Sequence, residues 1–248
     1  MPAAAIKLSI VIPAFNECMK VQGDIIAAAE FLTCSKLSGE IILVDDGSAD
    51  ATAAVATDAL AKTGASGKVI RLESNRGKGC AVRTGITASC GEYILFADSG
   101  MCVPFSNALR GLDMLSLHHC DIANGSRRLK ESVICCGTSH YRSFTSWMFR
   151  HMMPFIAGTP RRLSDTQCGF KMYRGTIGRE LYSKCTCDGF MFDIEVILLA
   201  VRAKCRIAEF PVEWSSDYDS RLHPVRYLPR MIKEIVAIRR EVSLAASR

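Results

Sequence analysis

Long hydrophobic runs are absent from this sequence of 248 residues. No apolar stretch approaches the ~20 residues that a membrane-spanning helix needs. The first residues, MPAAAIKLSI, also lack the charged head, long apolar stretch and cleavage site of a secretory signal. We therefore expect a cytoplasmic protein, and we expect any contact with the cytosolic face of a membrane to be peripheral.

Two further absences exclude nucleic-acid binding and a structural zinc site. The 31 lysine and arginine residues stand against 25 acidic residues, a net charge of +6, and no basic run is interleaved with aromatic residues. This small excess suits acidic small molecules or an anionic membrane better than duplex DNA. The 12 cysteines are scattered, and their closest pairs, Cys135–Cys136 and Cys185–Cys187, lack the spacing of a zinc knuckle. We expect reduced thiols and no nucleic-acid partner.

Short β-branched segments alternate with helix-like segments in the first half of the chain. The four predicted strands are LSIVIP (8–13), EIILVD (40–45), KVIRLE (68–73) and EYILFA (92–97). This alternation is typical of βαβ units and predicts an α/β fold, with a mostly parallel sheet flanked by helices. Ligands of such sheets bind outside the carboxyl ends of the strands, so we expect functional residues in the turns that follow them.

The second half of the chain has a different pattern. CDIANGS (120–126) predicts another strand, and residues 127–163 then become basic and aromatic, which we interpret as an acceptor region. The later predicted elements are a segment QCGFKMY (167–173), a helical stretch around 190–204, a strand over 205–214 and a terminal helix from about 225. No internal repeat or clear linker separates them.

Two of the turns after predicted strands suit a nucleoside. The first, PAFNE (13–17), combines an aromatic side chain with two polar ones and can hold a base and a ribose, although the same pattern also caps helices. The second places the adjacent carboxylates Asp45 and Asp46 at a strand end. Two like charges there favour a donor-rich partner, such as the imide of uracil or the hydroxyls of ribose.

Two more turns suit phosphate and a metal ion. The turn NRGKG (75–79) joins flexible glycines and two cations to the N–H-rich start of a helix, which suits a diphosphate. The turn FADSG (96–100) lies where a nucleotide-sugar enzyme carries its Asp-x-Asp metal motif, but Gly100 stands in place of the second aspartate. We therefore expect a Mg²⁺ or Mn²⁺ ion that binds weakly or is dispensable.

These motifs follow one another in the order found in glycosyltransferase family 2. The sequence resembles this family from about Leu8 to Trp214, and it is most similar to the dolichyl-phosphate β-glucosyltransferase branch. The segments SDTQCGFK, GFMFDIEV and PVEW are more specific to this family than any single earlier motif. The resemblance implies a Rossmann-like GT-A fold and a nucleoside diphosphate sugar as donor, usually with Mg²⁺ or Mn²⁺. It also implies inversion of the anomeric carbon in one displacement, with a polyprenyl phosphate as acceptor.

The same resemblance implies a set of site residues. Those expected to contact the nucleotide, or in the case of Asp46 to lie close by, are Pro13, Phe15, Glu17, Asp45, Asp46 and Lys78. Those expected to meet phosphate or the acceptor are Ser126, Arg127 and Arg128. The candidate catalytic residues are Asp98, which would face the diphosphate or its metal, and Asp165 and Gln167, which would lie near the sugar and the acceptor.

Three functions fit this inventory. An acceptor phosphate is already ionised at neutral pH and attacks without a strong base, so the expected reaction moves a hexose, glucose by the resemblance, from a UDP-sugar to a polyprenyl phosphate. A hydroxyl acceptor would need Asp165, Asp193 or Glu195 as base. A third interpretation is a nucleotide-sugar-binding protein that has lost catalysis with its second metal carboxylate.

Membrane contact has separate support in the sequence. Residues 141–156 mix aromatic residues and methionines with basic ones, as an interfacial segment does, although an aromatic core helix would look similar. Residues 225–248 hold six lysine or arginine residues against two glutamates, beside an apolar side. We expect a catalytic domain over 1–224, with a nucleotide-sugar half (1–126) and an acceptor half (127–224), followed by this basic amphipathic helix on an anionic membrane.

Overall fold

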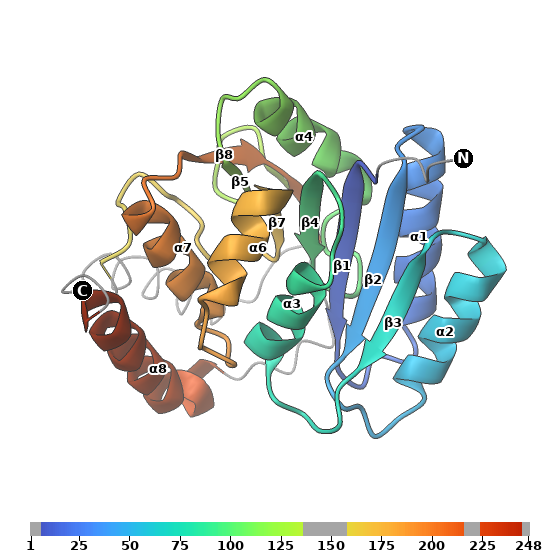
Figure 1. The fold of residues 1–248 in the computed structure, drawn as a ribbon, viewed down its shortest axis with the longest axis horizontal. Coiled ribbons are helices and arrows are strands. Elements are labelled where there is room, and N and C mark those ends of the chain that lie inside the picture. The colour runs from blue at the N-terminus through green and yellow to red at the C-terminus, as the bar shows by residue number, and fades with distance from the viewer. Residues whose placement is uncertain (1–5, 136–157, 216–223, 245–248) are drawn as a thin grey trace.

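A seven-stranded sheet forms the centre of the protein (Figure 1). The computed structural model describes residues 6–135, 158–215 and 224–244, with the side chains of the last helix described from Met231 to Glu241. The strands of the sheet are β1 (Leu8–Ala14), β2 (Gly39–Asp45), β3 (Gly67–Arg71), β4 (Tyr93–Ala97), β5 (Ile122–Ser126), β7 (Phe170–Arg174) and β8 (Ile207–Pro211). Their order is β3-β2-β1-β4-β7-β5-β8, and a second, short sheet pairs β6 (Val133–Ile134) with β9 (Glu213–Trp214).

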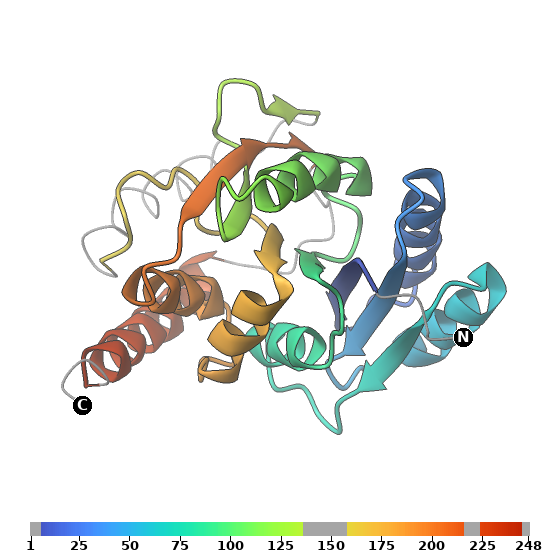
Figure 2. The same ribbon diagram turned by 45° about the horizontal axis from the view of Figure 1, so that its top comes forward.

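Helices cover both faces of the large sheet. They are α1 (Val21–Cys34), α2 (Thr52–Thr63), α3 (Lys78–Thr87), α4 (Ala108–Ser116), α6 (Gly175–Ser183), α7 (Phe192–Arg202) and α8 (Pro224–Leu244), with a 3-10 turn at Phe105–Asn107. Side chains of α1, α2 and α4 share one apolar cluster with the sheet, and those of α3, α6 and α7 share another. Figure 2 shows α4 on one side of the sheet and α3 with α6 on the other.

The apolar strand segments form these strands because both faces of the sheet are buried. Every residue of β1 is buried, and its successive side chains alternate between the two clusters, with Ile10 and Ile12 in the first and Val11 in the second. A strand buried on both faces needs an almost unbroken apolar run, which is the pattern of the predicted segments. The predicted strands are confirmed, and the segment 205–214 divides into β8 and β9.

One strand of the sheet runs against the others. β1 is parallel to β2 and β4, and β5 is parallel to β8, whereas β7 lies antiparallel between β4 and β5. The amino end of β7 therefore lies at the same edge as the carboxyl ends of β4 and β5, where Ala97 pairs with Phe170. This arrangement brings the segment before β7 beside the turns that follow β4 and β5.

The last helix packs against α7. Ile235 and Ile238 of α8 are buried with Met191 and Ile194, and the helix begins within a residue of its predicted start. No helix in the described parts of the chain is both long enough and apolar enough to cross a membrane. Residues 141–156 lie outside the described residues, so the interfacial segment predicted there remains a prediction, as does the division of the chain at residues 126 and 224.

Candidate active site

Polar turns gather at one edge of the sheet because parallel strands end there together. The turns after β1, β2, β4 and β5 lie at this edge, and the segment before the antiparallel β7 joins them. The sequence predicted site residues in each of these five segments. Lys78, which begins α3 after β3, pairs with Asp98 at the same edge. The residues of the turns after β1, β2 and β4 together with Lys78 are called the first group, and Arg127 and Asp165 with their neighbours are called the second group.

The turns after β1 and β2 are joined by hydrogen bonds. The N–H of Asn16 donates to Ser48 Oγ at 2.8 Å, and the Asn16 side chain accepts from the N–H of Ala49 at 2.9 Å. Asn16 has a φ of 53°, in the left-handed region that asparagine tolerates better than most residues. This junction positions Phe15, whose side chain is 38% exposed.

Asp45 and Asp98 each have one buried carboxylate oxygen without a hydrogen-bond donor among the described residues, and that of Asp98 lies 2.7 Å from Lys78 Nζ. Asp45 is 0% exposed, and its Oδ1 accepts from the N–H of Ser48 at 3.0 Å and from the Ser48 hydroxyl. Its Oδ2 lies 3.4 Å from Arg71 Nε and accepts no hydrogen bond from the described residues. A buried carboxylate oxygen without a donor is costly, so this oxygen is suited to a donor from a ligand.

The other predicted nucleotide contacts of the first turn differ in accessibility. Pro13 is buried inside β1, one residue before the strand ends at Ala14. Glu17 is half-buried, its carboxylate lies 3.2 Å from Lys20 Nζ, and its N–H donates to Thr52 Oγ1 at 2.9 Å. Phe15 and Glu17 are therefore accessible to a ligand, whereas Pro13 shapes the strand end.

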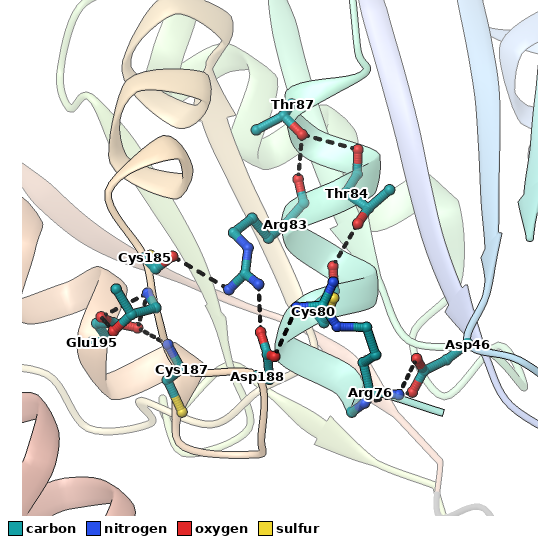
Figure 3. Close-up of polar contacts among 12 residues, drawn as sticks. Asp46, Arg76, Cys80, Arg83, Thr84, Thr87, Cys185, Cys187, Asp188 and Glu195 are labelled. Atoms are coloured by element: carbon teal, nitrogen blue, oxygen red, sulfur yellow. Dashed lines mark hydrogen bonds and ion pairs between the residues drawn. The ribbon is translucent and has the colours of Figure 1, made fainter. Parts of the chain in front are cut away.

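Asp46 holds the turn that precedes α3 (Figure 3). Its Oδ1 accepts from the N–H of Arg76 at 2.9 Å, and its Oδ2 accepts from the N–H of Gly77 at 2.8 Å and from Asn75 Nδ2 at 2.9 Å. Burial raises the pKa of the Asp46 carboxyl, while these N–H donors act against that rise. Asp46 thus lies close to the predicted nucleotide contacts, but both of its oxygens are engaged within the protein.

The start of α3 contacts the backbone of Asp188. The N–H groups of Gly79 and Cys80 donate to the carbonyl of Asp188, at 2.9 and 3.3 Å. These two donors are the ones that a diphosphate at the helix start would use, and the protein itself satisfies them. The N–H groups of Gly79 and Cys80 are therefore engaged within the protein, and the prediction that this turn serves a diphosphate stays a prediction that depends more on its cations, Arg76 and Lys78.

Lys78 and Asp98 form an ion pair between α3 and β4. Lys78 Nζ lies 2.7 Å from Asp98 Oδ1 and 5.6 Å from the centre of the Phe96 ring. Burial acts to lower the pKa of Lys78, but the carboxylates of Asp98 and Asp193 outweigh it and raise that pKa. Asp98 is held in turn by its N–H, which donates to the Gly169 carbonyl at 2.8 Å.

Asp24, which the sequence did not single out, shapes the turn after Asp98. This buried residue of α1 accepts from the Ser99 hydroxyl at 2.6 Å and from the N–H of Gly100 at 2.9 Å. Gly100 has a φ of 91°, a conformation in which a side chain is strained. Asp98 is therefore the only acidic side chain at the two positions of the metal motif, and no group of three or more metal-ligating side chains occurs among the described residues.

Arg127 and Asp165 form the second group. Arg127 donates to Asp165 through Nε at 2.6 Å and Nη2 at 2.8 Å, and its backbone N–H lies 3.1 Å from the same carboxylate. Burial acts to raise the pKa of the Asp165 carboxyl, but Arg127 outweighs it and lowers that pKa to about 2. The Arg127 guanidinium also lies 5.6 Å from the Trp214 ring. Asp165 is a paired carboxylate with little basicity.

The remaining residues around this group are held by hydrogen bonds. Ser126 and Ser164 share one at 2.8 Å, and the N–H of Arg128 donates to the Ser126 hydroxyl at 3.2 Å. Glu209, which the sequence did not indicate, accepts from the N–H groups of Ser164 and Asp165, each at 2.8 Å. Gln167 is placed next to them by its N–H, which points to Asp165 at 3.4 Å.

The two acids of α7 are buried and paired. Asp193 lies 2.7 Å from Lys171 Nζ, with both side chains almost completely buried. Glu195 accepts from the N–H groups of Thr186 and Cys187, at 3.0 and 2.8 Å. These buried contacts give both acids a structural role.

The chain is similar to known proteins over most of its length. The sequence profile described as Glycosyl transferase family 2 matches residues 9–177. The chain belongs to this family. "Dolichyl-phosphate beta-glucosyltransferase" of Dictyostelium discoideum is 32% identical over 96% of this chain and 75% of its own length. The human protein of the same name is 32% identical over 94% of this chain and 75% of its own length. This family 2 member is therefore a glycosyltransferase enzyme.

Solved structures show the same fold. Glucosyl-3-phosphoglycerate synthase from Mycobacterium tuberculosis, in complex with Mn²⁺, UDP and glucosyl-3-phosphoglycerate, matches with a TM-score of 0.69 and 18% identity, over 96% of this chain and 80% of that chain. Mannosyl-3-phosphoglycerate synthase from Rubrobacter xylanophilus matches with a TM-score of 0.65 and 19% identity, over 98% of this chain and 76% of that chain. The predicted GT-A fold is confirmed.

Proposed function

We propose that this family 2 glycosyltransferase moves glucose from UDP-glucose to the phosphate of dolichyl phosphate. The names of the relatives that align over nearly the whole chain support this donor and acceptor. The main support for a phosphate acceptor is that the described site offers no suitable general base. The acids that the sequence offered as a general base for a hydroxyl acceptor are paired inside the protein.

Each of those three acids is unsuited to remove a proton from an acceptor. Asp165 is bound bidentately by Arg127, and its pKa of about 2 makes its carboxylate a weak base. Asp193 is buried against Lys171, and Glu195 is buried against the 186–187 turn. A phosphate acceptor needs no such base, because its oxygen is already ionised at neutral pH. The geometry therefore favours phosphate over hydroxyl.

The donor is assigned to the first group of residues. The buried, open Oδ2 of Asp45 receives the imide of uracil or a ribose hydroxyl, and Phe15 and Glu17 lie at the same strand ends for the rest of the nucleoside. Lys78 and Arg76 serve the diphosphate, because cations offset the charge that develops on this leaving group. The inverting displacement then depends mainly on alignment and electrostatics.

The acceptor is assigned to the second group. Arg127 and Arg128 follow β5 at the same sheet edge, and they receive the acceptor phosphate by charge-assisted hydrogen bonds. Asp165 holds Arg127 in place, and Gln167 lies beside them for the sugar. In this arrangement Asp165 acts through Arg127 and does not take a proton.

Asp98 fits a divalent ion only in part. Mg²⁺ bound to a diphosphate commonly takes one or two protein carboxylates and keeps several waters. Asp98 supplies one carboxylate, Gly100 supplies none, and Lys78 already lies 2.7 Å from Asp98. We propose that Mg²⁺ or Mn²⁺ is held by Asp98 alone, adds weakly to affinity and, when bound, supplies positive charge to the leaving diphosphate.

The exposed side of α8 supports contact with an anionic membrane. Ile235 and Ile238 face α7, whereas Ile232 and Val236 are 42% and 60% exposed beside the exposed cations Lys233 and Arg240. An apolar pair flanked by basic residues suits the boundary between headgroups and acyl chains. We propose that this side of α8 lies on the cytosolic face of the membrane that carries the lipid acceptor.

Release of UDP tests the proposal directly. Purified protein is incubated with UDP-glucose or GDP-mannose, with dolichyl phosphate added or omitted. We expect rapid UDP release only with UDP-glucose and dolichyl phosphate together, and a matched Lys78→Gln variant should be strongly impaired. Release that does not depend on the lipid phosphate, or faster reaction with GDP-mannose, would overturn the assigned substrates.

A further inference from the structure

The segment between α6 and α7 carries an acid at its apex that contacts the start of α3 (Figure 3). Besides the two hydrogen bonds from Gly79 and Cys80 to the Asp188 carbonyl, the backbones meet so closely that a Cβ on Gly77 would overlap this carbonyl. A Cβ on Gly79 would overlap the Cys187 carbonyl in the same way. The glycines of the NRGKG turn are thus required for backbone packing against this segment.

The Asp188 side chain binds two arginines on either side of this contact. Its Oδ2 lies 3.2 Å from Arg76 Nη2, and its Oδ1 accepts from Arg83 Nη2. Arg83 also donates through Nη1 to the Cys185 carbonyl at 3.3 Å. One carboxylate therefore joins the turn before α3 to the body of that helix.

Asp46 holds the same turn from the opposite side. As Figure 3 shows, Asp46 and Asp188 lie on either side of Arg76, one at the end of β2 and the other in the segment after α6. Asp46 fixes the backbone of the turn, whereas Asp188 fixes the side chain of Arg76. Lys78 follows directly in the chain and reaches Asp98 from this fixed turn.

The segment that carries Asp188 is itself anchored at both ends. Glu195 holds its beginning through the N–H groups of Thr186 and Cys187. Glu234 of α8 holds its end, where it accepts from the N–H of Met191 at 3.3 Å and leaves no room for a side chain at Gly189. Asp188 is thus presented by a segment with fixed ends, which is what a positioning residue requires.

We propose that Asp188 is a positioning residue of the donor site, which holds Arg76 and the start of α3 so that Arg76 and Lys78 face the donor diphosphate. This inference rests on the proposed function, because it assigns the diphosphate to these cations. Asp188 does not touch the nucleotide itself. Its loss leaves Arg76 without this carboxylate partner and loosens the turn, which weakens binding of phosphate more than binding of the nucleoside.

Binding of UDP and of uridine tests this inference. The variants are Asp188→Ala and Asp188→Asn, and the control is Asp121→Asn, because Asp121 also pairs with two arginines, Arg174 and Arg206, at the opposite edge of the sheet. Dissociation constants are measured by calorimetry at fixed ionic strength. We expect Asp188→Ala to weaken UDP by about tenfold, a change of about 1.4 kcal/mol, while uridine changes by less than about twofold.

The milder variant Asp188→Asn and the kinetics of transfer distinguish a positioning role of Asp188 from a general loss of folding. Asp188→Asn keeps an oxygen that accepts a hydrogen bond, so its effect on UDP should lie between those of Asp188→Ala and Asp121→Asn. In the transfer reaction, KM for UDP-glucose should rise more than kcat falls. UDP affinities of both Asp188 variants equal to that of Asp121→Asn would overturn the inference, as would equal losses of UDP and uridine. A wild-type protein that binds neither ligand would overturn the proposed function as well.

Discussion

Replacement of Asp165 by asparagine should destabilise the protein in a pH-dependent way. Asp165 is 4% exposed, and the Arg127 guanidinium lowers the pKa of its carboxyl in the folded protein to about 2, below the ~3.9 of an unperturbed aspartate. At ~1.4 kcal/mol for each tenfold change in proton affinity, this lowering contributes on the order of 2–3 kcal/mol of stability at neutral pH. Because the folded pKa is lowered, this stability is present above about pH 4 and is lost as the pH falls toward 2.

Urea unfolding of wild-type protein and of Asp165→Asn, followed by circular dichroism from pH 7 to pH 3, measures this contribution. The free energies of unfolding should differ by about 2–3 kcal/mol at pH 7, and the difference should shrink steadily below pH 4. Asp113→Asn, which changes an exposed aspartate of α4, serves as control and should differ little from wild type. A difference between Asp165→Asn and wild type that stays constant down to pH 3 would refute the assigned ion pair with Arg127.

Three further predictions concern the donor, the metal position and the membrane. UDP should raise the melting temperature more than GDP does. Asp45→Ala should abolish this shift without unfolding the protein, and unchanged UDP affinity in this variant would show that Asp45 does not belong to the site. Excess EDTA should weaken UDP binding by about tenfold at most, and strict metal dependence would contradict the single-carboxylate site. Gly169→Ala, whose Cβ would overlap the Asp98 carboxylate, should slow transfer far more than Gly23→Ala in α1, whose Cβ would make only an ordinary contact. Anionic liposomes should retain the protein at low salt and release it at high salt, because each lysine or arginine near such a surface contributes about 1 kcal/mol of binding free energy. Equal recovery with neutral liposomes would contradict the role given to α8.

The strands and the turns after them could be predicted from the sequence because local patterns determine both. A strand buried on both faces, such as β1, must be apolar along its length, and polar residues must therefore collect where it ends. The antiparallel direction of β7 could not be predicted in this way. A single strand carries no local sign of its direction, which is set by its pairing with β4 and β5.

The partners of the site residues could not be predicted, because they are far apart in the chain. Asp46 bonds to residues about thirty positions away, and Asp165 pairs with Arg127 at a separation of 38 residues. Asp24 and Asp188 are single acids, one in an apolar helix and one in a connecting segment, and neither belongs to a recognisable motif. Only the fold shows that they hold the turns around Asp98 and Lys78.

We propose above all that the acceptor is an ionised phosphate and that no carboxylate of the described site acts as its base. This proposal is tested most directly by offering the purified protein UDP-glucose with either dolichyl phosphate or dolichol, in the same detergent at neutral pH, and analysing the lipid products by mass spectrometry. We predict glucosylated dolichyl phosphate and no glucosylated dolichol. Transfer of glucose to dolichol at a comparable rate would contradict the account, because the protein would then have to supply a base, whereas Asp165 is paired with Arg127 and Asp193 and Glu195 are buried in contacts within the protein.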